Sequence, residues 1–247
     1  MKNVIKKIVS LPFKLTFNLR TSPLWTNSET QKAFVAERFI LTRMPYGPYL
    51  EEKLDYTEDS YDFVRTYSME LYAKNILENK VPGSIAELGV FNGAFAKRLN
   101  GAFPKRKLYL FDTFEGFPTT DLNHDIEEGY ETLVQDFSGT SPELVLSKMP
   151  HRENCIIKKG YFPSTAEGLE ENFAFVNIDT DLYLPIYEGL KYFYPRLSQG
   201  GAIFIHDYNN KIYEGAKAAV DTFISEQEQS IKTFPLADYG GTIVLLK

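Results

Sequence analysis

From Ser84 onward the sequence alternates short apolar runs with helix-length segments, and this alternation restricts the fold more than any other feature. Strands are predicted at 84–88, 107–111, 155–158, 173–178, 202–205 and 242–246, and helices at 94–101, 142–148, 184–197 and 213–226. Strands that alternate with helices form a mostly parallel sheet with helices on both faces. We therefore predict a Rossmann-like α/β fold, in which ligands bind beyond the carboxyl ends of the strands.

The chain before this region is predicted to add a helical extension. We expect residues 1–55 to form the extension and residues 56–247 to form one α/β domain, with a helix at 58–80. Near the start, apolar residues recur at helical spacing: Met1, Val4, Ile5, Ile8 and Leu11. Such a helix could pack on the body or on a partner subunit, remain a disordered arm, or touch a membrane surface peripherally. No apolar run approaches the roughly 20 residues that a membrane span needs.

Composition excludes several classes of protein. The net charge of -6 disfavours nucleic acid as a partner, because phosphate contacts need clustered basic residues. The single cysteine, Cys155, rules out an internal disulfide framework and a cysteine zinc cluster, and it fits a reducing cytoplasm. Because Cys155 lies in an apolar run, we predict a buried thiol. Residues 119–140 are polar, and we expect an irregular loop there, either a solvated acidic loop or a lid that includes His124.

A glycine-containing acidic motif follows the first predicted strand. Gly89 and Gly93 allow the backbone to approach a ligand closely, and Asn92 lies between them. Glu87 suits a cationic group such as an amine and would repel a pyrophosphate. Because the motif also lacks the full G-x-G-x-x-G fingerprint, a nucleotide-dependent oxidoreductase is disfavoured.

The second predicted strand ends in Asp112, at about the 20-residue spacing expected of an acid that accepts ribose hydroxyls. Acids also follow two later strands. Asp179 and Asp181 come after the strand at 173–178, and Asp207 comes one helix and one strand later. These carboxylates are hard oxygen donors that suit magnesium, manganese or calcium. The adjacent His206 could bind a metal, act as a base, or only donate a hydrogen bond.

These motifs together resemble a known family. E-L-G-V-x-x-G, L-Y-L-F-D-T-F-E-G-F, I-D-T-D-L-Y and H-D-Y are similar to the macrocin-type sugar O-methyltransferases, which are class I methyltransferases that use S-adenosylmethionine and a divalent metal. The resemblance implies that residues 56–247 are the methyltransferase domain. It implies cofactor contacts from a set of residues on four strand ends: Glu87, Gly89, Asn92, Gly93, Asp112, Thr113, Phe114, Gly160, Tyr161, Phe162 and Asp179.

The resemblance also suggests roles for the acids. It implies metal binding by Asp179 and Asp207, with magnesium expected and manganese as the alternative, and it implies that Asp181 is the general base. The family usually has Asp-Asp-Tyr where this chain has His206-Asp207-Tyr208, so we count His206 as a further candidate metal ligand and catalytic residue. Imidazole suits manganese, iron or zinc better than magnesium.

We therefore predict methyl transfer from S-adenosylmethionine to a hydroxyl of a sugar, carried by a nucleotide, a glycan or a glycosylated natural product. A catechol-type phenol acceptor and a NAD-dependent sugar-modifying enzyme on a similar fold are the alternatives. The expected partner is a small-molecule acceptor, with no nucleic acid. A cytoplasmic homodimer is the expected state of the protein.

Overall fold

The computed structural model describes residues 62–130 and 132–247, apart from the side chain of Phe63. The predicted apolar face from Met1 to Leu11 and the boundary at residue 55 lie outside these residues. Within the described part of the chain, no helix is long and apolar enough to cross a membrane.

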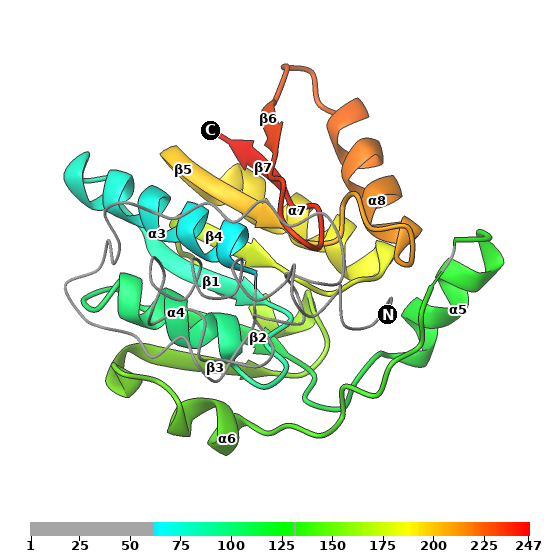
Figure 1. The fold of residues 1–247 in the computed structure, drawn as a ribbon, viewed down its shortest axis with the longest axis horizontal. Helices are drawn as coiled ribbons and strands as arrows, with labels where there is room; N and C mark the ends of the chain where they lie inside the picture. The colour runs from blue at the N-terminus through cyan, green and yellow to red at the C-terminus, as the bar shows by residue number, and fades with distance from the viewer. Residues whose placement is uncertain (1–61, 131) are drawn as a thin grey trace, which may run out of the picture. The chain divides into compact units, whose positions relative to one another are not determined.

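A seven-stranded sheet forms the centre of the fold, in the order β3-β2-β1-β4-β5-β7-β6 (Figure 1). The strands are β1 (Ser84–Leu88), β2 (Leu108–Asp112), β3 (Cys155–Lys159), β4 (Phe173–Ile178), β5 (Leu197–Ile205), β6 (Lys232–Pro235) and β7 (Ile243–Leu246). The first five strands pair in parallel, whereas β7 runs antiparallel to both β5 and β6. This topology confirms the predicted Rossmann-like class.

Helices cover both faces of the sheet. They are α3 (Phe63–Glu78), α4 (Ala94–Ala102), α5 (Thr119–Glu127), α6 (Pro142–Ser147), α7 (Tyr183–Arg196) and α8 (Glu214–Ser225), with short 3-10 turns η1 (Arg152–Asn154) and η2 (Ser164–Ala166). One apolar cluster joins α3, α4 and α6 to one face of the strands. A second cluster joins α7 and α8 to the opposite face. The sheet is thus buried from both sides, as its apolar strands predict.

Aromatic side chains make up much of the core on the α7 face. The ring of Phe193 lies 5.1 Å from that of Phe173, 5.8 Å from Phe111 and 5.6 Å from Phe162. All four side chains are at least nine-tenths buried. Each Phe→Ala change in such a cluster costs about 3–5 kcal/mol. The high aromatic content therefore serves packing to a large extent.

The structure corrects three predictions. Residues 119–127 form a helix, because Asp121 and Asp125 are buried against the body instead of solvated. Strand β6 was not predicted, since all its residues are exposed and carry no apolar periodicity. Cys155 is only half buried, because β3 is the outermost strand at its end of the sheet.

Candidate functional site

The carboxyl ends of four neighbouring strands carry strained backbone. Besides Lys80, the described non-glycine residues with positive φ are Phe91, Phe114, Asp181 and Asp207, which follow β1, β2, β4 and β5. Left-handed backbone costs an L-residue about 1–2 kcal/mol, and such strain concentrates at functional sites. The predicted site therefore coincides with the strained edge of the sheet.

Gly89 allows the loops after β1 and β4 to touch. Its φ is +85°, and a Cβ placed on it would lie 2.0 Å from the backbone oxygen of Asp179. A hydrogen bond also joins the two loops, because the N–H of Asp179 donates to the carbonyl of Leu88 at 2.8 Å. Only glycine fits this position, and the close approach that the sequence predicted toward a ligand is made here toward the backbone of Asp179.

Asp112 organises the loop beyond β1. One carboxylate oxygen accepts from the N–H groups of Val90 (2.6 Å) and Phe91 (2.8 Å), and the other accepts from Phe114 (2.6 Å). A carboxylate has about four acceptor positions. Asp112 thus retains about one acceptor position for a ligand hydroxyl, in addition to its structural role.

A buried polar row connects α3 to the site. Arg65 lies 4.3 Å above the ring of Phe95 and donates from one guanidinium nitrogen to Asn177 (2.8 Å) and Asp179 (2.9 Å). Asn177 donates to Oε1 of Glu87 at 3.0 Å. Burial, together with the charge of Asp179, raises the pKa of Glu87 well above its usual value. Its other carboxylate oxygen is buried and has no hydrogen-bond partner among the described residues.

His206 bridges two of the predicted metal ligands. Its Nδ1 lies 2.7 Å from Asp207 and 3.1 Å from Asp179. Burial and the charge of Arg65 lower the pKa of His206, but the attraction of Asp179 and the hydrogen bonds to both acids raise it to about 10. Burial raises the pKa of Asp179, yet the positive charges of Arg65 and His206 outweigh burial and hold that pKa well below its usual value.

Asp181 has the opposite electrostatic environment. Burial raises its pKa well above the usual value, and the charges of Asp179 and Asp207 and a hydrogen bond with Asp207 add to the rise. The structure therefore brings all four predicted metal and base residues together, from the loops after β4 and β5. The pKa of Asp179 is thus lowered and that of Asp181 raised, a division typical of acid–base sites.

The remaining predicted cofactor residues lie around the ends of β1, β2 and β3. Gly160 donates its N–H to the carbonyl of Asp112 at 2.9 Å, whereas Thr113 closes its own turn by donating to the carbonyl of Gly116. Asn92 accepts from the N–H of Ala94 at 3.0 Å, at the start of α4. Gly93 precedes α4 with a φ of +81° and provides no side-chain cap.

The two residues after Gly160 differ in exposure. Tyr161 is exposed and donates its hydroxyl proton to Asp121 of α5 at 2.7 Å. Phe162 is buried in the aromatic core, so its side chain faces away from solvent. Of this turn, only Gly160 and Tyr161 are placed where a side chain or backbone could meet a ligand directly.

Sequence reasoning missed several residues of the site. Arg65 and Asn177 belong to the buried polar row. Tyr213 lies near Asp181: burial of its hydroxyl and the charge of Asp181 raise the pKa of Tyr213 to about 12. Arg65 shares the buried face of α3 with Met69 and Ile76, so an arginine at helical spacing from apolar residues was a signal that could have identified it. No local pattern marks Tyr213.

The strand order, the glycine turn after β1 and the acids after β2, β4 and β5 define a class I, Rossmann-like methyltransferase fold. A profile of the macrocin-O-methyltransferase (TylF) family matches residues 63–242. The chain belongs to this family.

Two curated relatives show the range of the match. The mycinamicin III 3''-O-methyltransferase of Micromonospora griseorubida is 27% identical over 158 residues, which are 58% of this chain and 62% of the relative. The demethyldecarbamoylnovobiocin O-methyltransferase of Streptomyces niveus is 25% identical over 166 residues, 61% of each chain. The chain thus spans about three fifths of the length of the curated relatives that it matches.

Solved structures agree on the fold. The O-methyltransferase NovP superposes with a TM-score of 0.62 at 21% identity, over 74% of this chain and 79% of that chain. The calicheamicin methyltransferase CalS11 superposes with a TM-score of 0.57 at 22% identity, over 74% and 78%. At these identities the likeness establishes the architecture.

Proposed function

We propose that this protein transfers a methyl group from S-adenosylmethionine to a hydroxyl of a sugar on a glycosylated natural product. Membership of the macrocin-O-methyltransferase family supports the reaction, and the names of the relatives support the class of acceptor. The observation that carries the proposal is the convergence of Asp179, Asp181, His206 and Asp207 beside the Glu87–Gly89 turn.

The residues around β1 and β2 fit the cofactor. The buried, unpartnered oxygen of Glu87 is available to an ammonium group, and Asp112 retains an acceptor position for a ribose hydroxyl. Gly93 leaves the first turn of α4 without a side-chain cap from that residue, and it lets α6 pack closely there, because a Cβ would lie 3.0 Å from Val145. When bound, S-adenosylmethionine supplies an activated methyl group on a sulfonium, so the protein must mainly orient and deprotonate the acceptor.

The donor set also fits a divalent metal. One ligand atom each of Asp179, His206 and Asp207 lies within 4.8 Å of the others. Neighbouring ligands on an octahedral ion with bonds of about 2.1 Å lie about 3 Å apart, close to the 2.7 and 3.1 Å seen around Nδ1 of His206. The imidazole makes manganese a better match than magnesium. A metal held there would polarise the acceptor hydroxyl, and His206 would serve as a ligand only after losing the proton on Nδ1.

Asp181 is the better placed proton acceptor. Its raised pKa makes it a stronger base once ionised, and a cation held by Asp179 and Asp207 would keep it ionised. His206, with a pKa raised to about 10, retains its proton at neutral pH, which disfavours it as the base and lets it balance the charges of Asp179 and Asp207. Arg65 holds Asp179 in place from the side of α3.

Methyl transfer can be tested by mass spectrometry. The protein is incubated with S-adenosylmethionine and a panel of glycosylated natural products, nucleotide sugars and a catechol, and each acceptor is examined for the mass of one added methylene. A sugar acceptor that gains this mass supports the proposal, whereas methylation of the catechol alone would support the phenol alternative. Tight NAD binding without S-adenosylmethionine binding, measured by calorimetry, would refute the assignment.

The metal is tested separately. An Asp207→Ala variant, which leaves the pair of Asp179 with Arg65 in place, is expected to lose methyl transfer while it still binds S-adenosylmethionine in calorimetry. EDTA should abolish the wild-type rate, and manganese should restore it. An unchanged rate in EDTA would show that the metal part of the proposal is wrong and leave the methyl transfer intact.

A further inference from the structure

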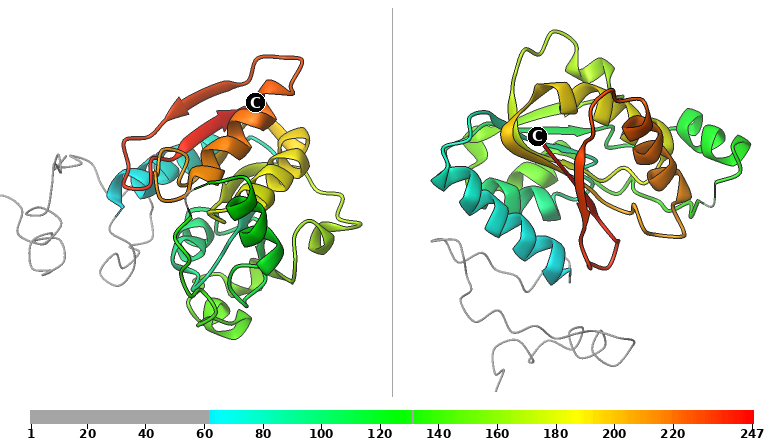
Figure 2. Two further views of the ribbon diagram at one scale, coloured as in Figure 1. Left: turned by 90° about the vertical axis from the view of Figure 1, so that its right-hand side faces the viewer. Right: turned by 90° about the horizontal axis from the view of Figure 1, so that it is seen from above.

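Helix α5 is held against the body of the protein through two buried carboxylates. Asp121 and Asp125 are 1% and 0% exposed, although the helix lies beyond the carboxyl ends of the strands, where α7 and α8 begin (Figures 1 and 2). Asp121 accepts from the hydroxyl of Tyr161, in the turn after β3, at 2.7 Å. Asp125 accepts from the backbone N–H of Tyr183, at 3.2 and 3.3 Å to its two oxygens. The two acids thus fasten α5 at different places.

Asp125 takes the place of a missing helix cap. Tyr183 is the first residue of α7, so its N–H has no partner within the helix, and the N-cap residue Leu182 makes no side-chain hydrogen bond. A carboxylate at a helix N-terminus is stabilising, because it accepts from an unpaired N–H and faces the positive end of the helix dipole. A residue of α5 therefore caps α7, across 58 residues of sequence.

The start of α8 packs on the same carboxylate. A Cβ placed on Gly215, in the first turn of α8, would lie 2.3 Å from Oδ2 of Asp125 and 3.1 Å from the backbone nitrogen of Tyr183. Only glycine allows α8 to begin this close. The helices α5, α7 and α8 therefore meet at one buried side chain.

This contact lies two residues from Asp181. The backbone between them turns tightly, because the N–H of Leu182 donates to the carbonyl of Thr180 at 2.6 Å, and Asp181 has a φ of +63°. Left-handed backbone at a non-glycine residue persists only where its surroundings hold it. On the strand side, a backbone hydrogen bond ties the turn to β1. On the helix side, Asp125 holds the turn through the N–H of Tyr183.

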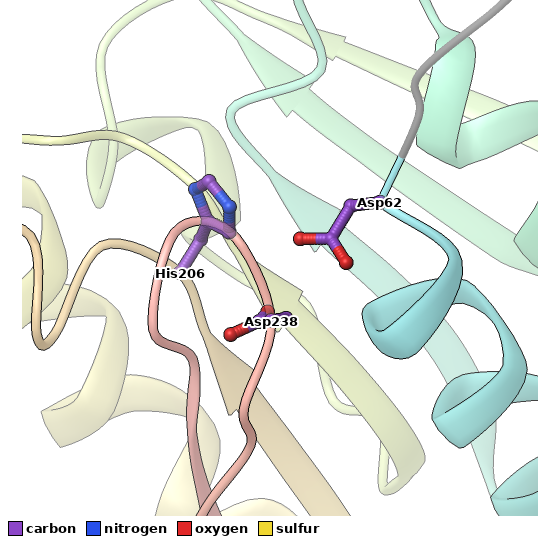
Figure 3. Close-up of side chains that lie close together, drawn as sticks. All are labelled: Asp62, His206 and Asp238. Carbon is purple, nitrogen blue, oxygen red and sulfur yellow. The ribbon is translucent and has the colours of Figure 1, made fainter. Parts of the chain in front are cut away.

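The turn after β5 is supported from another direction. Figure 3 shows His206 beside Asp62, at the start of α3, and Asp238, in the loop between β6 and β7. This loop packs on the imidazole, since a Cβ placed on Gly240 would lie 2.1 Å from Nε2. Asp62 joins the loop to α3, because it caps the helix and also accepts from the N–H of Tyr239 at 2.9 Å. These contacts come from α3 and the hairpin, so a change in α5 leaves them in place.

We propose that Asp125 is a positioning residue that holds the turn of Asp181 in place and couples it to the docking of α5. It acts through the N–H of Tyr183, two residues from the proposed base. A misplacement of about 1 Å in a catalytic group can cost about 100-fold in rate, so a turn freed at one end should react more slowly. The inference rests on the proposed function for its consequence in catalysis, but not for the hold on the turn.

Variants on one helix separate this hold from simple packing. Asp125→Ala removes both oxygens, whereas Asp125→Asn keeps the size and one acceptor for the N–H of Tyr183. The matched control is Asp121→Ala, which removes an equally buried carboxylate that fastens α5 at the other place. Glu226→Gln is the second control, since Glu226 accepts from the hydroxyl of Tyr187 on an exposed part of α7. Thermal unfolding identifies any variant that fails to fold, and Asp125→Ser, with its shorter side chain, then replaces Asp125→Ala.

The first measurement reads the hold directly. Amide exchange is followed in ¹H–¹⁵N spectra of tyrosine-labelled protein, in which a Tyr183→Phe variant assigns the signal of Tyr183. We expect this amide to exchange about tenfold or more faster in Asp125→Ala, because a hydrogen bond to a charged acceptor is lost. Asp125→Asn should slow the exchange again, and Asp121→Ala should leave it unchanged. An unchanged rate in Asp125→Ala, or an equal rise in Asp121→Ala, would overturn the proposal whatever reaction the protein catalyses.

The second measurement reads the consequence for catalysis. We expect kcat to fall about 10–100-fold in Asp125→Ala and to recover for the most part in Asp125→Asn, with KM for S-adenosylmethionine unchanged in both. Glu226→Gln should keep the wild-type kcat. A loss of stability in Asp125→Ala with an unchanged kcat would show a merely structural role and overturn the proposal. If wild-type protein methylates no acceptor, the proposed function fails, while amide exchange still decides whether Asp125 holds the turn.

Discussion

Removal of Arg65 should be among the most destabilising changes at the site. Arg65 is 6% exposed and connects α3 to Asn177 and Asp179 through one guanidinium nitrogen. Breaking a buried ion pair by deleting one partner costs about 3–5 kcal/mol, because the other charge remains buried. For a domain of this size each kcal/mol lowers Tm by about 2–4 °C, so Arg65→Met should lower Tm by about 6–20 °C.

Urea unfolding followed by circular dichroism measures the free energy of unfolding of each variant. The control is Lys74→Met on the same helix, whose ion pair with Glu78 spans 3.8 Å between exposed side chains and is worth about 0–1 kcal/mol. Arg65→Lys keeps the charge but loses the stacking on Phe95, worth about 1–2 kcal/mol, and should fall between the two. If Arg65→Met costs no more than Lys74→Met, the buried row does not stabilise the fold.

The pH dependence provides a second check. Because the folded pKa of Asp179 is depressed, its ion pair contributes stability above the unfolded pKa of about 4, and that stability is lost as the pH falls below it. The difference between wild type and Arg65→Met should therefore shrink below about pH 4. A difference that stays constant or grows toward acid would contradict the assigned partnership.

Three further changes test other parts of the structure. Gly89→Ala would place a Cβ 2.0 Å from the backbone oxygen of Asp179 in left-handed backbone, and calorimetry should show loss of S-adenosylmethionine binding together with a stability loss of about 2–5 kcal/mol. Asp112→Ala removes the acceptor of three backbone N–H groups. Cofactor affinity and the protection of the loop after β1 from amide exchange should therefore fall together. Lost affinity with unchanged amide exchange would contradict the structural role of Asp112. Burial and the charge of Glu153 raise the pKa of Cys155 to about 11, so iodoacetamide at pH 8 should react with it about tenfold or more slowly than with glutathione; an equal rate would show that the thiol is not shielded.

The carboxyl-end acids were predictable because the signals are local. Apolar runs of strand length ending in Asp112, Asp179 or Asp207 identify the strand ends, and parallel strands place those ends at one edge. Gly89 likewise predicts a turn in which two backbone segments lie close together. Sequence alone therefore indicated both the fold and the acidic half of the site.

The other half depends on tertiary contacts. Arg65 comes from a helix that precedes the sheet. Asp62, which caps that helix, accepts from the N–H of Tyr239 in the β6–β7 hairpin, whose first strand consists of exposed residues. Their positions follow from how these elements pack, which no local periodicity reveals. Helix α5 was missed for the same reason: its sequence is polar, and it is held by buried contacts of Asp121 with Tyr161 and of Asp125 with the N–H of Tyr183.

The contact between Asp62 and the β6–β7 hairpin has a consequence for how the chain reaches its final state. Asp62 accepts from the N–H of Tyr239 across 177 residues, and Arg65 reaches Asp179 across 114. Contacts of such long sequence separation form late, since loop-closure entropy must be overcome first. During synthesis the helix that supplies Arg65 emerges well before the hairpin, so the contact of Asp62 with Tyr239 forms only after the hairpin has been added. Formation of that contact is therefore a marker of finished folding, and a chain truncated before Asp238 would keep the sequence of strands β1 to β5 but lack the contact.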